Sequence, residues 1–240
     1  MNKKNRPVCA IFLVLIFCTL HASIFAQWGV KIGVTSSSFY YSDSKPNPYQ
    51  GFDIDLRPYL GYDIEWVQLG NQKPVVYPYL SVFYNLPIAN RFYLQPELSL
   101  IQKGVSFSQH EYERIIYKVR INYLEIPLSM AYQFINKEKF SSAFYLGGYA
   151  AFKINAVKKV ATHNSSVETT KIDCVENLEA GYHLGINFRQ TLFQQNFFFD
   201  IRFFGGLTDL FYMPNDQPVL YYETPKTKST GLHISLGYAF

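Results

Sequence analysis

Apolar and polar residues alternate along most of the chain from residue 27 onward. In residues 121–134, for example, Leu124 and Ile126 share one face, and Tyr123 and Glu125 lie on the other. Successive side chains of a β-strand point to opposite faces, so this alternation predicts strands and not helices. The segments are about 9–11 residues long, the length of a tilted membrane-spanning strand. Eight strands are predicted, at residues 28–34, 75–88, 91–101, 121–134, 142–155, 178–188, 197–206 and 231–240.

The two faces of these strands favour a membrane barrel over a water-soluble sandwich. One face is almost uninterrupted in its large apolar side chains, and the other holds charges and glycines, which suits a narrow polar lumen. The connections also alternate in length, and short turns with longer outer loops are typical of outer-membrane barrels. Short connections at 88–91, 136–140 and 191–195 alternate with long polar ones at 41–74, 108–118, 157–173 and 210–228. We therefore predict an all-β fold, an eight-stranded antiparallel transmembrane β-barrel.

Two places depart from the simple pattern. The first outer loop, Tyr41–Pro74, is long, and within it Phe52 and Ile54 alternate with acidic residues. An added hairpin there gives ten strands, which stays open as an alternative. Pro96 and Pro127 fall inside predicted strands, where each removes a ladder hydrogen bond. A closed barrel has no free edge strand, so we expect a β-bulge at each proline.

The start of the chain has the layout of a secretory signal peptide. A positively charged beginning is followed by an uncharged apolar run over residues 8–20 and a short stretch that ends at Ala26. The predicted cleavage lies between Ala26 and Gln27. The chain is thereby divided into a signal peptide, 1–26, and a barrel domain, 27–240, which places the protein in the outer membrane of a Gram-negative cell.

The composition excludes several classes of function. Aromatic residues make up 18% of the chain and charged residues only 17%, below the usual quarter of a globular domain. Three of the 22 basic residues lie in the signal peptide, which leaves 19 against 18 acidic residues and no basic excess for a nucleic acid. Cys174 is the single cysteine beyond the signal peptide. No Cys/His cluster has metal-ligand spacing, so we expect no disulfide, no metal and no cofactor.

Charged residues on the inward-facing side of the strands are balanced in sign. Charges buried apart are very costly, whereas paired charges in a polar lumen are tolerated. We therefore predict an ion-pair network inside the barrel, read either as a structural plug or as a proton or ion path. Its predicted members are Lys31, Glu97, Glu125, Lys153, Glu179, Arg189, Asp200 and Arg202.

Several stretches resemble the Bacteroidetes outer-membrane β-barrel family, whose members are often called porin-family or PorT-like proteins. The resemblance rests on NRFYLQPEL with the following QKG, NYLEIPL, GVKIG, GGLTDL and the strand that ends the chain; these are residues 90–98 with 102–104, 122–128, 29–33, 205–210 and 231–240. It covers nearly the whole mature chain and implies a barrel of OmpA/OmpX size. It further implies that Leu236, Tyr238 and Phe240 form the C-terminal signal read by the barrel-assembly machinery.

These observations predict an integral outer-membrane protein with a structural or binding role through its outer loops. A small-solute porin and a PorT-like accessory of protein secretion stay open as alternatives. Against an open pore, four tyrosines are predicted to point inward, at positions 93, 123, 145 and 149. A lipid-modifying enzyme is a third reading, with His183 and His233 near Asp200 and Ser235 in projection. No G-x-S-x-G, H-E-x-x-H or P-loop motif is present, so we expect no enzyme activity.

The expected partners follow from the predicted location. They are outer-membrane lipid and lipopolysaccharide, the barrel-assembly machinery during biogenesis, and secretion-system components, with no nucleic acid. Four lysines in the outer connections are candidates for contacts with lipopolysaccharide, namely Lys158, Lys159, Lys226 and Lys228. Trp28 and Trp66 are expected to join the aromatic girdles at the membrane interfaces.

Overall fold

The computed structural model describes residues 27–41, 73–109, 115–161, 167–193, 195–212 and 226–240. The predicted signal peptide with Ala26, Trp66 and the possible hairpin within Tyr41–Pro74 lie outside the described residues. Gln27, the predicted first residue of the mature chain, is the first residue of the first strand.

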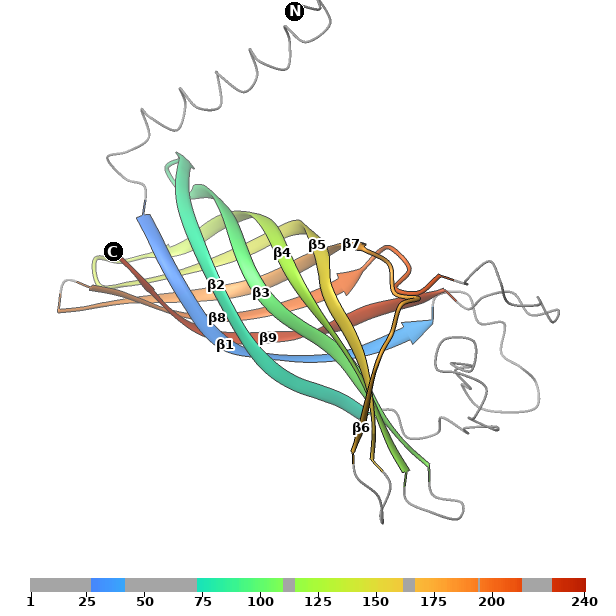
Figure 1. Cartoon of the computed structure of the whole chain (residues 1–240). Coiled ribbons are helices and arrows are strands. Elements are labelled where there is room, and N and C mark those ends of the chain that lie inside the picture. Colours follow the sequence, from blue (N-terminus) through green and yellow to red (C-terminus); the bar gives the residue numbers. More distant parts are fainter. Residues whose placement is uncertain (1–26, 42–72, 110–114, 162–166, 194, 213–225) are drawn as a thin grey trace, which may run out of the picture.

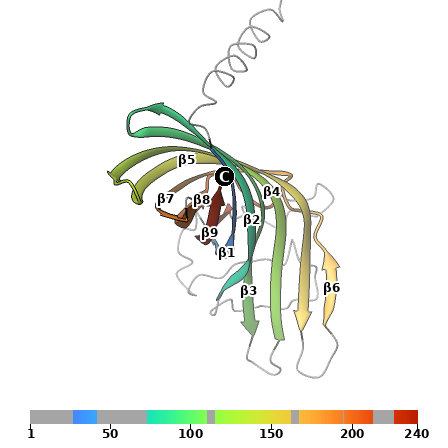
Figure 2. The same cartoon turned by 90° about the vertical axis from the view of Figure 1, so that its left-hand side faces the viewer.

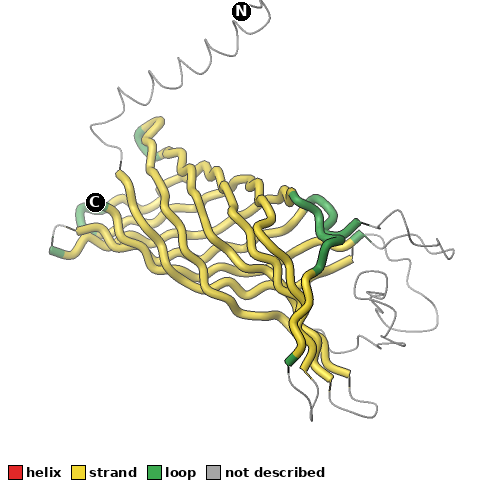
Figure 3. The backbone as a smooth tube through the Cα atoms, in the orientation of Figure 1, coloured by secondary structure: helices red, strands yellow, loops and turns green. Residues whose placement is uncertain are grey.

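Eight strands close into an antiparallel barrel, which confirms the predicted fold class (Figures 1 and 3). Around the barrel the order is β1, β2, β3, β4, β5, β7, β8 and β9, and β9 pairs back with β1. The short strand β6 pairs only with β5. The strands are β1 Gln27–Tyr41, β2 Lys73–Ala89, β3 Phe92–Gln109, β4 Ile115–Asn136, β5 Phe140–Ala161, β6 Glu168–Lys171, β7 Leu178–Leu192, β8 Gln195–Gly206 and β9 Thr227–Ala239.

The two ends of the barrel differ. We call the end with the short β2–β3, β4–β5 and β7–β8 connections the turn end, and the opposite end the loop end. The first residue of β1 and the last of β9 also lie at the turn end (Figure 1). Short connections at one end and longer ones at the other are typical of outer-membrane barrels.

The wall of the barrel is apolar on its outer face, and in the turn-end half its inner face carries charged and polar side chains, the reverse of a water-soluble fold. Outward Ile32 is 66% exposed and Leu146 is 62% exposed, whereas inward Lys31 is 1% exposed. Among the described residues there is no helix with the length and apolar character needed to cross a membrane.

Aromatic pairs ring the turn end on the outer surface. The rings of Trp28 and Tyr84, on β1 and β2, have centroids 4.7 Å apart, and Phe134 and Phe144, on β4 and β5, are also 4.7 Å apart. Further pairs join β3 to β4, β7 to β8 and β8 to β9: Phe92–Tyr132, Phe188–Phe199 and Phe197–Tyr238. This ring is the aromatic girdle expected at a membrane interface, and Trp28 belongs to it as predicted.

Three strands are much longer than a bilayer requires. β3 has 18 residues and β4 and β5 have 22 each, about twice the 9–11 residues of a spanning strand. Their loop-end halves continue past the other strands, and β6 adds to the edge of β5 (Figure 2). We call this part, the loop-end halves of β3, β4 and β5 together with β6, the projecting sheet.

The expected bulges at Pro96 and Pro127 are wrong. Along β3 and β4 the pairs Pro96–Leu128 and Ser99–Glu125 keep the same register, and the ladder is only interrupted between them. Both prolines lie at this one interruption. The β3–β4 ladder is unpaired there, so the lack of an N–H group costs no ladder hydrogen bond and no extra residue is inserted. Bulges occur elsewhere, in β2–β3 between Pro74 and Tyr79 and between Pro87 and Ala89, and in β4–β5 between Asn122 and Tyr123 and between Gln133 and Ile135.

Candidate functional site

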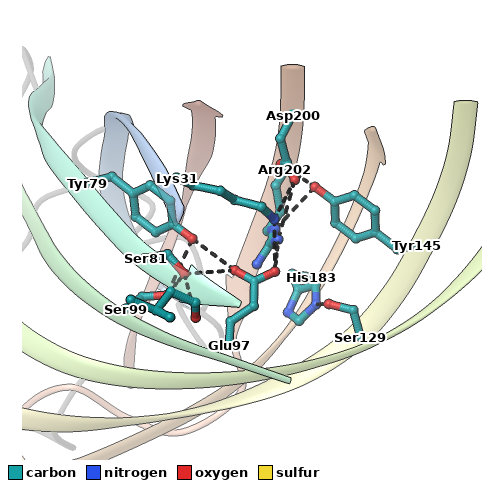
Figure 4. Close-up of polar contacts among 11 residues, drawn as sticks. Lys31, Tyr79, Ser81, Glu97, Ser99, Ser129, Tyr145, His183, Asp200 and Arg202 are labelled. Carbon is teal, nitrogen blue, oxygen red and sulfur yellow. Dashed lines mark hydrogen bonds and ion pairs between the residues drawn. The ribbon is translucent and has the colours of Figure 1, made fainter. Parts of the chain in front are cut away.

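Four charged side chains from three strands meet inside the barrel, and we call them the four-charge cluster. Lys31 on β1, Glu97 on β3, and Asp200 and Arg202 on β8 are all at most 4% exposed. Lys31 Nζ lies 3.0 Å from Glu97 Oε1 and 2.9 Å from Asp200 Oδ2. Arg202 Nη2 lies 2.6 Å from Glu97 Oε1 and 3.6 Å from Asp200 Oδ2 (Figure 4). Two cations and two anions balance, which is the condition under which buried charges are tolerated.

Neutral groups complete the hydrogen bonds of these carboxylates. The hydroxyls of Tyr79 and Ser81 donate to Glu97 Oε2 at 3.1 and 3.2 Å, and that of Tyr145 donates to Asp200. Arg202 Nε donates to the Tyr145 hydroxyl at 3.3 Å (Figure 4). A fully satisfied network of this kind is rigid and holds its strands in one arrangement.

A second group, the three-charge cluster, joins Lys103 on β3 to Glu125 on β4 and Glu179 on β7. Lys103 Nζ lies 3.0 Å from Glu125 Oε2 and 3.1 Å from Glu179 Oε1. The Tyr149 hydroxyl donates to Glu179 Oε1 at 2.7 Å, and the Ser229 hydroxyl donates to the same oxygen. The cluster therefore holds one ammonium and two carboxylates.

Aromatic rings surround the ammonium of this cluster. Lys103 Nζ lies 4.1 Å from the ring centroid of Tyr149, 4.8 Å from that of Phe204 and 5.4 Å from that of Tyr123. The negative faces of the rings add a cation–π attraction that is strongest when water is excluded. Lys103 itself is 0% exposed, so it is held entirely by protein groups.

Six of the eight residues predicted for the lumen network lie in these two clusters: Lys31, Glu97, Glu125, Glu179, Asp200 and Arg202. The other two have different partners. Lys153 donates to the backbone carbonyl of Val175, and Arg189 Nε donates to Ser141 Oγ at 2.9 Å. Lys103 was not predicted, although it has the same strand parity as Glu97. The signal was missed because the strand was expected to end at Ile101, whereas β3 runs to Gln109.

The two inward histidines bind hydroxyl groups of neighbouring strands. His183 Nε2 and Ser129 Oγ are 2.7 Å apart, as are His233 Nδ1 and Thr35 Oγ1. All four residues are at most 2% exposed. Neither histidine has a hydrogen bond to Asp200 or Ser235 among the described contacts. The residues that were predicted to lie near the histidines therefore do not form a catalytic pair with them. The His233 ring is stacked between those of Tyr79 and Phe204, with centroids 5.1 and 4.5 Å away.

The loop-end half of the lumen is filled by apolar side chains. Ile121, Val119 and Tyr123 of β4 are at most 1% exposed there. Two segments beyond the strands complete this apolar cluster, and a β-bridge between Val175 and Phe211 joins them. They contribute Ile172, Cys174, Val175, Leu210 and Phe211. We call these two segments the cap. Cys174 is a buried thiol of the cap, and burial raises the pKa of this thiol.

A cavity of about 780 Å³ lies at the turn end. Arg189, Tyr93 and Asn187 line it from the strands, and Arg91 lines it from the β2–β3 turn. No acidic side chain is among its lining residues. Tyr93 is half-buried in this cavity, whereas the other three tyrosines predicted to point inward are at most 5% exposed.

The residues of the predicted C-terminal assembly signal lie on the outer wall at the turn end. Leu236 is 64% exposed and Phe240 is 71% exposed. The Tyr238 ring packs between Phe197 and Phe240. The Phe240 amide donates to the Trp28 carbonyl at 3.0 Å, which ties the chain end to β1.

The described side chains fill the lumen in successive levels, from the four-charge cluster to the apolar cluster under the cap. Ionisable groups that are held by opposite charges and hydroxyls are suited to stabilising a closed barrel. Within the described part of the chain, no group of His, Cys, Asp and Glu has the arrangement of a metal site.

A comparison with known families agrees with this architecture. The model of the outer membrane protein beta-barrel domain family matches residues 21–212. Among solved structures, Ail of Yersinia pestis in complex with the heparin analogue sucrose octasulfate has 12% identity and a TM-score of 0.39, with 90% of this chain and 99% of that chain covered. OprG of Pseudomonas aeruginosa has 12% identity and a TM-score of 0.41, with 90% and 96% covered. No curated protein gives a significant match.

Proposed function

The chain belongs to the outer membrane protein beta-barrel domain family, and from this premise we propose that it is a closed barrel that acts through its outer surface. Its role is structural or binding, and it neither conducts solutes nor catalyses a reaction. The observation that carries the proposal is the projecting sheet, which continues the wall beyond a filled lumen (Figure 2). Strands of 22 residues exceed what a bilayer requires, so this part of the wall is available to contact other molecules.

The filled lumen supports a closed barrel over a small-solute porin. An eight-stranded barrel has an interior just wide enough for side chains. Here Lys31, Lys103 and Tyr123 are each at most 1% exposed in that interior. An aqueous path would have to break buried ion pairs, which costs several kcal/mol for each uncompensated charge.

The burial of the histidines argues against catalysis. A hydrolytic centre needs a nucleophile and a base that a substrate reaches. Ser129 and His183 have a suitable spacing of 2.7 Å, but they are 0% and 1% exposed. A lipid held in the surrounding bilayer has no access to such a pair.

Export and assembly follow the usual route in this proposal. Residues 1–26 act as the signal peptide, with cleavage between Ala26 and Gln27, and the assembly machinery reads Leu236, Tyr238 and Phe240. Two of these three side chains are more than 60% exposed on the outer wall, which suits recognition of the last strand before the barrel closes. Outer-membrane lipid is then the permanent partner of the apolar band.

The test of the closed barrel is single-channel conductance of the refolded protein in a planar bilayer. We expect no channel conductance from protein that shows the heat-dependent gel shift of a folded barrel. A steady, reproducible conductance of the folded protein would overturn the proposal in favour of the porin. Insertion is verified independently by protection of the wall strands from protease after the same protein preparation is reconstituted into lipid vesicles.

A PorT-like accessory role in protein secretion, within the Bacteroidetes family that the sequence resembles, is the second candidate. The turn-end cavity supports it, because this end faces the periplasm and carries Arg91 and Arg189 without an acidic neighbour in its lining. A secretion component would meet the barrel there. A photo-crosslinking amino acid at position 91, at the turn end, should then capture a periplasmic component, whereas one at position 171, in β6, should not.

A further inference from the structure

The outward face of β4 changes from apolar to basic in one step. From the turn end, Tyr132, Met130, Leu128, Ile126 and Leu124 form an apolar stripe. Eight residue steps of about 3.3 Å give about 26 Å of strand, and a tilt of about 40° leaves roughly 20 Å of this along the membrane normal, which is most of the apolar band of an outer-membrane barrel. The next outward positions are Asn122, Arg120 and Lys118. These cations therefore lie just beyond the membrane boundary, at the base of the projecting sheet.

The neighbouring strand places a like charge directly opposite. Lys118 of β4 is paired with Lys159 of β5 in the strand register, so their side chains share one face. Residues directly opposite in an antiparallel pair have Cβ atoms about 4.5–5.5 Å apart, and like charges there are destabilising. Arg120 is two positions along the same face of β4. Three cations therefore lie on one face of β4 and β5, within two residue positions of one another.

The described part of the chain supplies no counter-charge for this group. No carboxylate forms an ion pair with Lys118, Arg120 or Lys159 among the described residues, and the Nε of Arg120 is buried without a hydrogen-bond partner. On β6, Lys171 shares this side of the sheet but is paired with Asp173 at 2.8 Å. The arrangement thus carries an uncompensated repulsion between like charges, which an external anion bound to the exposed ends of these side chains would remove.

We propose that Lys118, Arg120 and Lys159 bind the phosphate groups of lipopolysaccharide in the outer leaflet, a site that rests on the proposed orientation with the loop end outside. The guanidinium of Arg120 donates to phosphate oxygens in the paired geometry that arginine favours, and the two lysines supply point charges on either side. The acyl chains of the same molecule lie against the apolar stripe, where Ile126 is 46% exposed and Phe152 of β5 is 46% exposed. A free anion uses only the cations, whereas a phosphorylated glycolipid uses both surfaces, and this combination favours the lipid.

The test compares two triple variants of the refolded full chain. In the site variant, Lys118, Arg120 and Lys159 are replaced by Gln. In the control, Arg91, Lys137 and Lys139 are replaced by Gln; these residues are exposed at the turn end and lose the same three charges. The probe is lipid A with both phosphates, titrated into detergent-solubilised protein. We expect wild type and control to bind alike and the site variant to bind at least about tenfold more weakly, which is the loss of one charge-assisted contact or more.

A second measurement keeps the inference testable if lipid-binding titrations are limited by micelle partition. Lys159→Gln alone relieves the repulsion, so it should raise the thermal midpoint in lipid-free detergent and lower it, relative to wild type, in saturating lipid A. Equal binding by the site variant and the control, or equal affinity of wild type for inorganic phosphate and lipid A, would overturn the inference. Neither result affects the silence expected in the conductance test, so failure of this site is distinguishable from failure of the closed-barrel proposal.

Discussion

The ammonium of Lys103 lies 3.1 Å from Oε1 of Glu179, deep in a lumen where the lysine has no exposed surface. Oε2 of Glu125 approaches the same ammonium at 3.0 Å, but no hydroxyl donates to that oxygen among the described contacts. The two carboxylates are thus unequal. Glu179 is fixed by Lys103, Tyr149 and Ser229, and Glu125 is the surplus charge.

This difference between the two carboxylates predicts how three substitutions rank in the loss of unfolding free energy. Lys103→Met leaves two carboxylates without a cation and should lower the free energy of unfolding by about 3–5 kcal/mol. Glu125→Gln removes the surplus charge and should change stability by less than about 1 kcal/mol in either direction. Glu179→Gln removes the better-held carboxylate and should fall between the two. Urea unfolding of the refolded barrel, followed by tryptophan fluorescence, measures all three.

The matched controls lie in the β4–β5 turn, where Glu138 and Lys139 are exposed. Glu138→Gln and Lys139→Met make the same chemical changes outside the lumen and should leave the urea midpoint unchanged. An Lys103→Met variant as stable as Lys139→Met would refute the role of the cluster.

Glu97 is the centre of the other cluster, and its loss should be costly. Glu97→Gln leaves Lys31 and Arg202 sharing Asp200 alone, and it weakens the bonds from Tyr79 and Ser81. We expect a loss of about 3–5 kcal/mol in unfolding free energy, since an uncompensated buried charge remains. The temperature at which the folded band disappears on an unboiled gel should fall accordingly. A midpoint equal to that of Glu138→Gln would show that the cluster is not needed for stability.

The sequence predicted which faces the charges occupy but not which of them meet. Parity along a strand places Glu97, Lys153 and Arg189 inward, and this follows from a period of two. Whether inward groups touch depends on the stagger of strands that are not neighbours in the chain, such as β3 and β8 across the lumen. That stagger is a property of barrel closure and tilt. Lys153 and Arg189 therefore have local partners at the two ends, although their parity was read in the same way.

The ends of the strands were the harder part to predict. Alternation predicted eight strands, but β3, β4 and β5 continue beyond the residues expected, and Lys103 lies in that continuation. Water-exposed β-structure has a weaker apolar pattern than the lipid-facing band, so the signal fades at the membrane boundary. The prediction of bulges at Pro96 and Pro127 was wrong for a different reason. A ladder that is interrupted without a change of register leaves no trace in the alternation.

Cys174 reports on the cap at the loop end. Its burial raises the pKa of the thiol, so at a given pH the folded protein holds a smaller fraction of the reactive thiolate than a free cysteine does. Labelling by a maleimide should be slow near neutral pH. The labelling rate should rise about tenfold per pH unit, and this rise should continue above the pH at which the labelling rate of an ordinary thiol becomes constant. Stopped labelling followed by mass measurement checks this profile.

Loosening the cap should remove that protection. Phe211→Ala removes a ring from the apolar cluster that holds Cys174, next to the Val175–Phe211 bridge. Labelling should then become faster and approach the ordinary pH profile. Leu207→Ala, at a position of the same segment that is 59% exposed, is the control and should leave the rate close to wild type. Fast labelling of the unaltered folded protein would mean that the cap is open in solution.

Two adjacent glycines of β5 give the sharpest test of lumen packing. Gly147 faces inward, and a Cβ there would meet the Leu128 carbonyl and lie 2.7 Å from His183 Nε2. Gly148 faces outward, and a Cβ there would have only the Gly181 carbonyl nearby, at 3.4 Å. Gly147→Ala should therefore displace His183 from Ser129 and cost about 1–3 kcal/mol, as overpacking does.

Gly148→Ala is the matched control, since the same atom is added one residue away. It should be neutral or stabilising by up to about 1 kcal/mol, because alanine restricts the unfolded chain. Histidine NMR chemical shifts, compared between the two variants, separate displacement of His183 from a general loss of stability. If both alanine variants unfolded at the same urea concentration as wild type, the lumen would have space for a methyl group at Gly147. The tight packing of Gly147 against His183 would then be refuted.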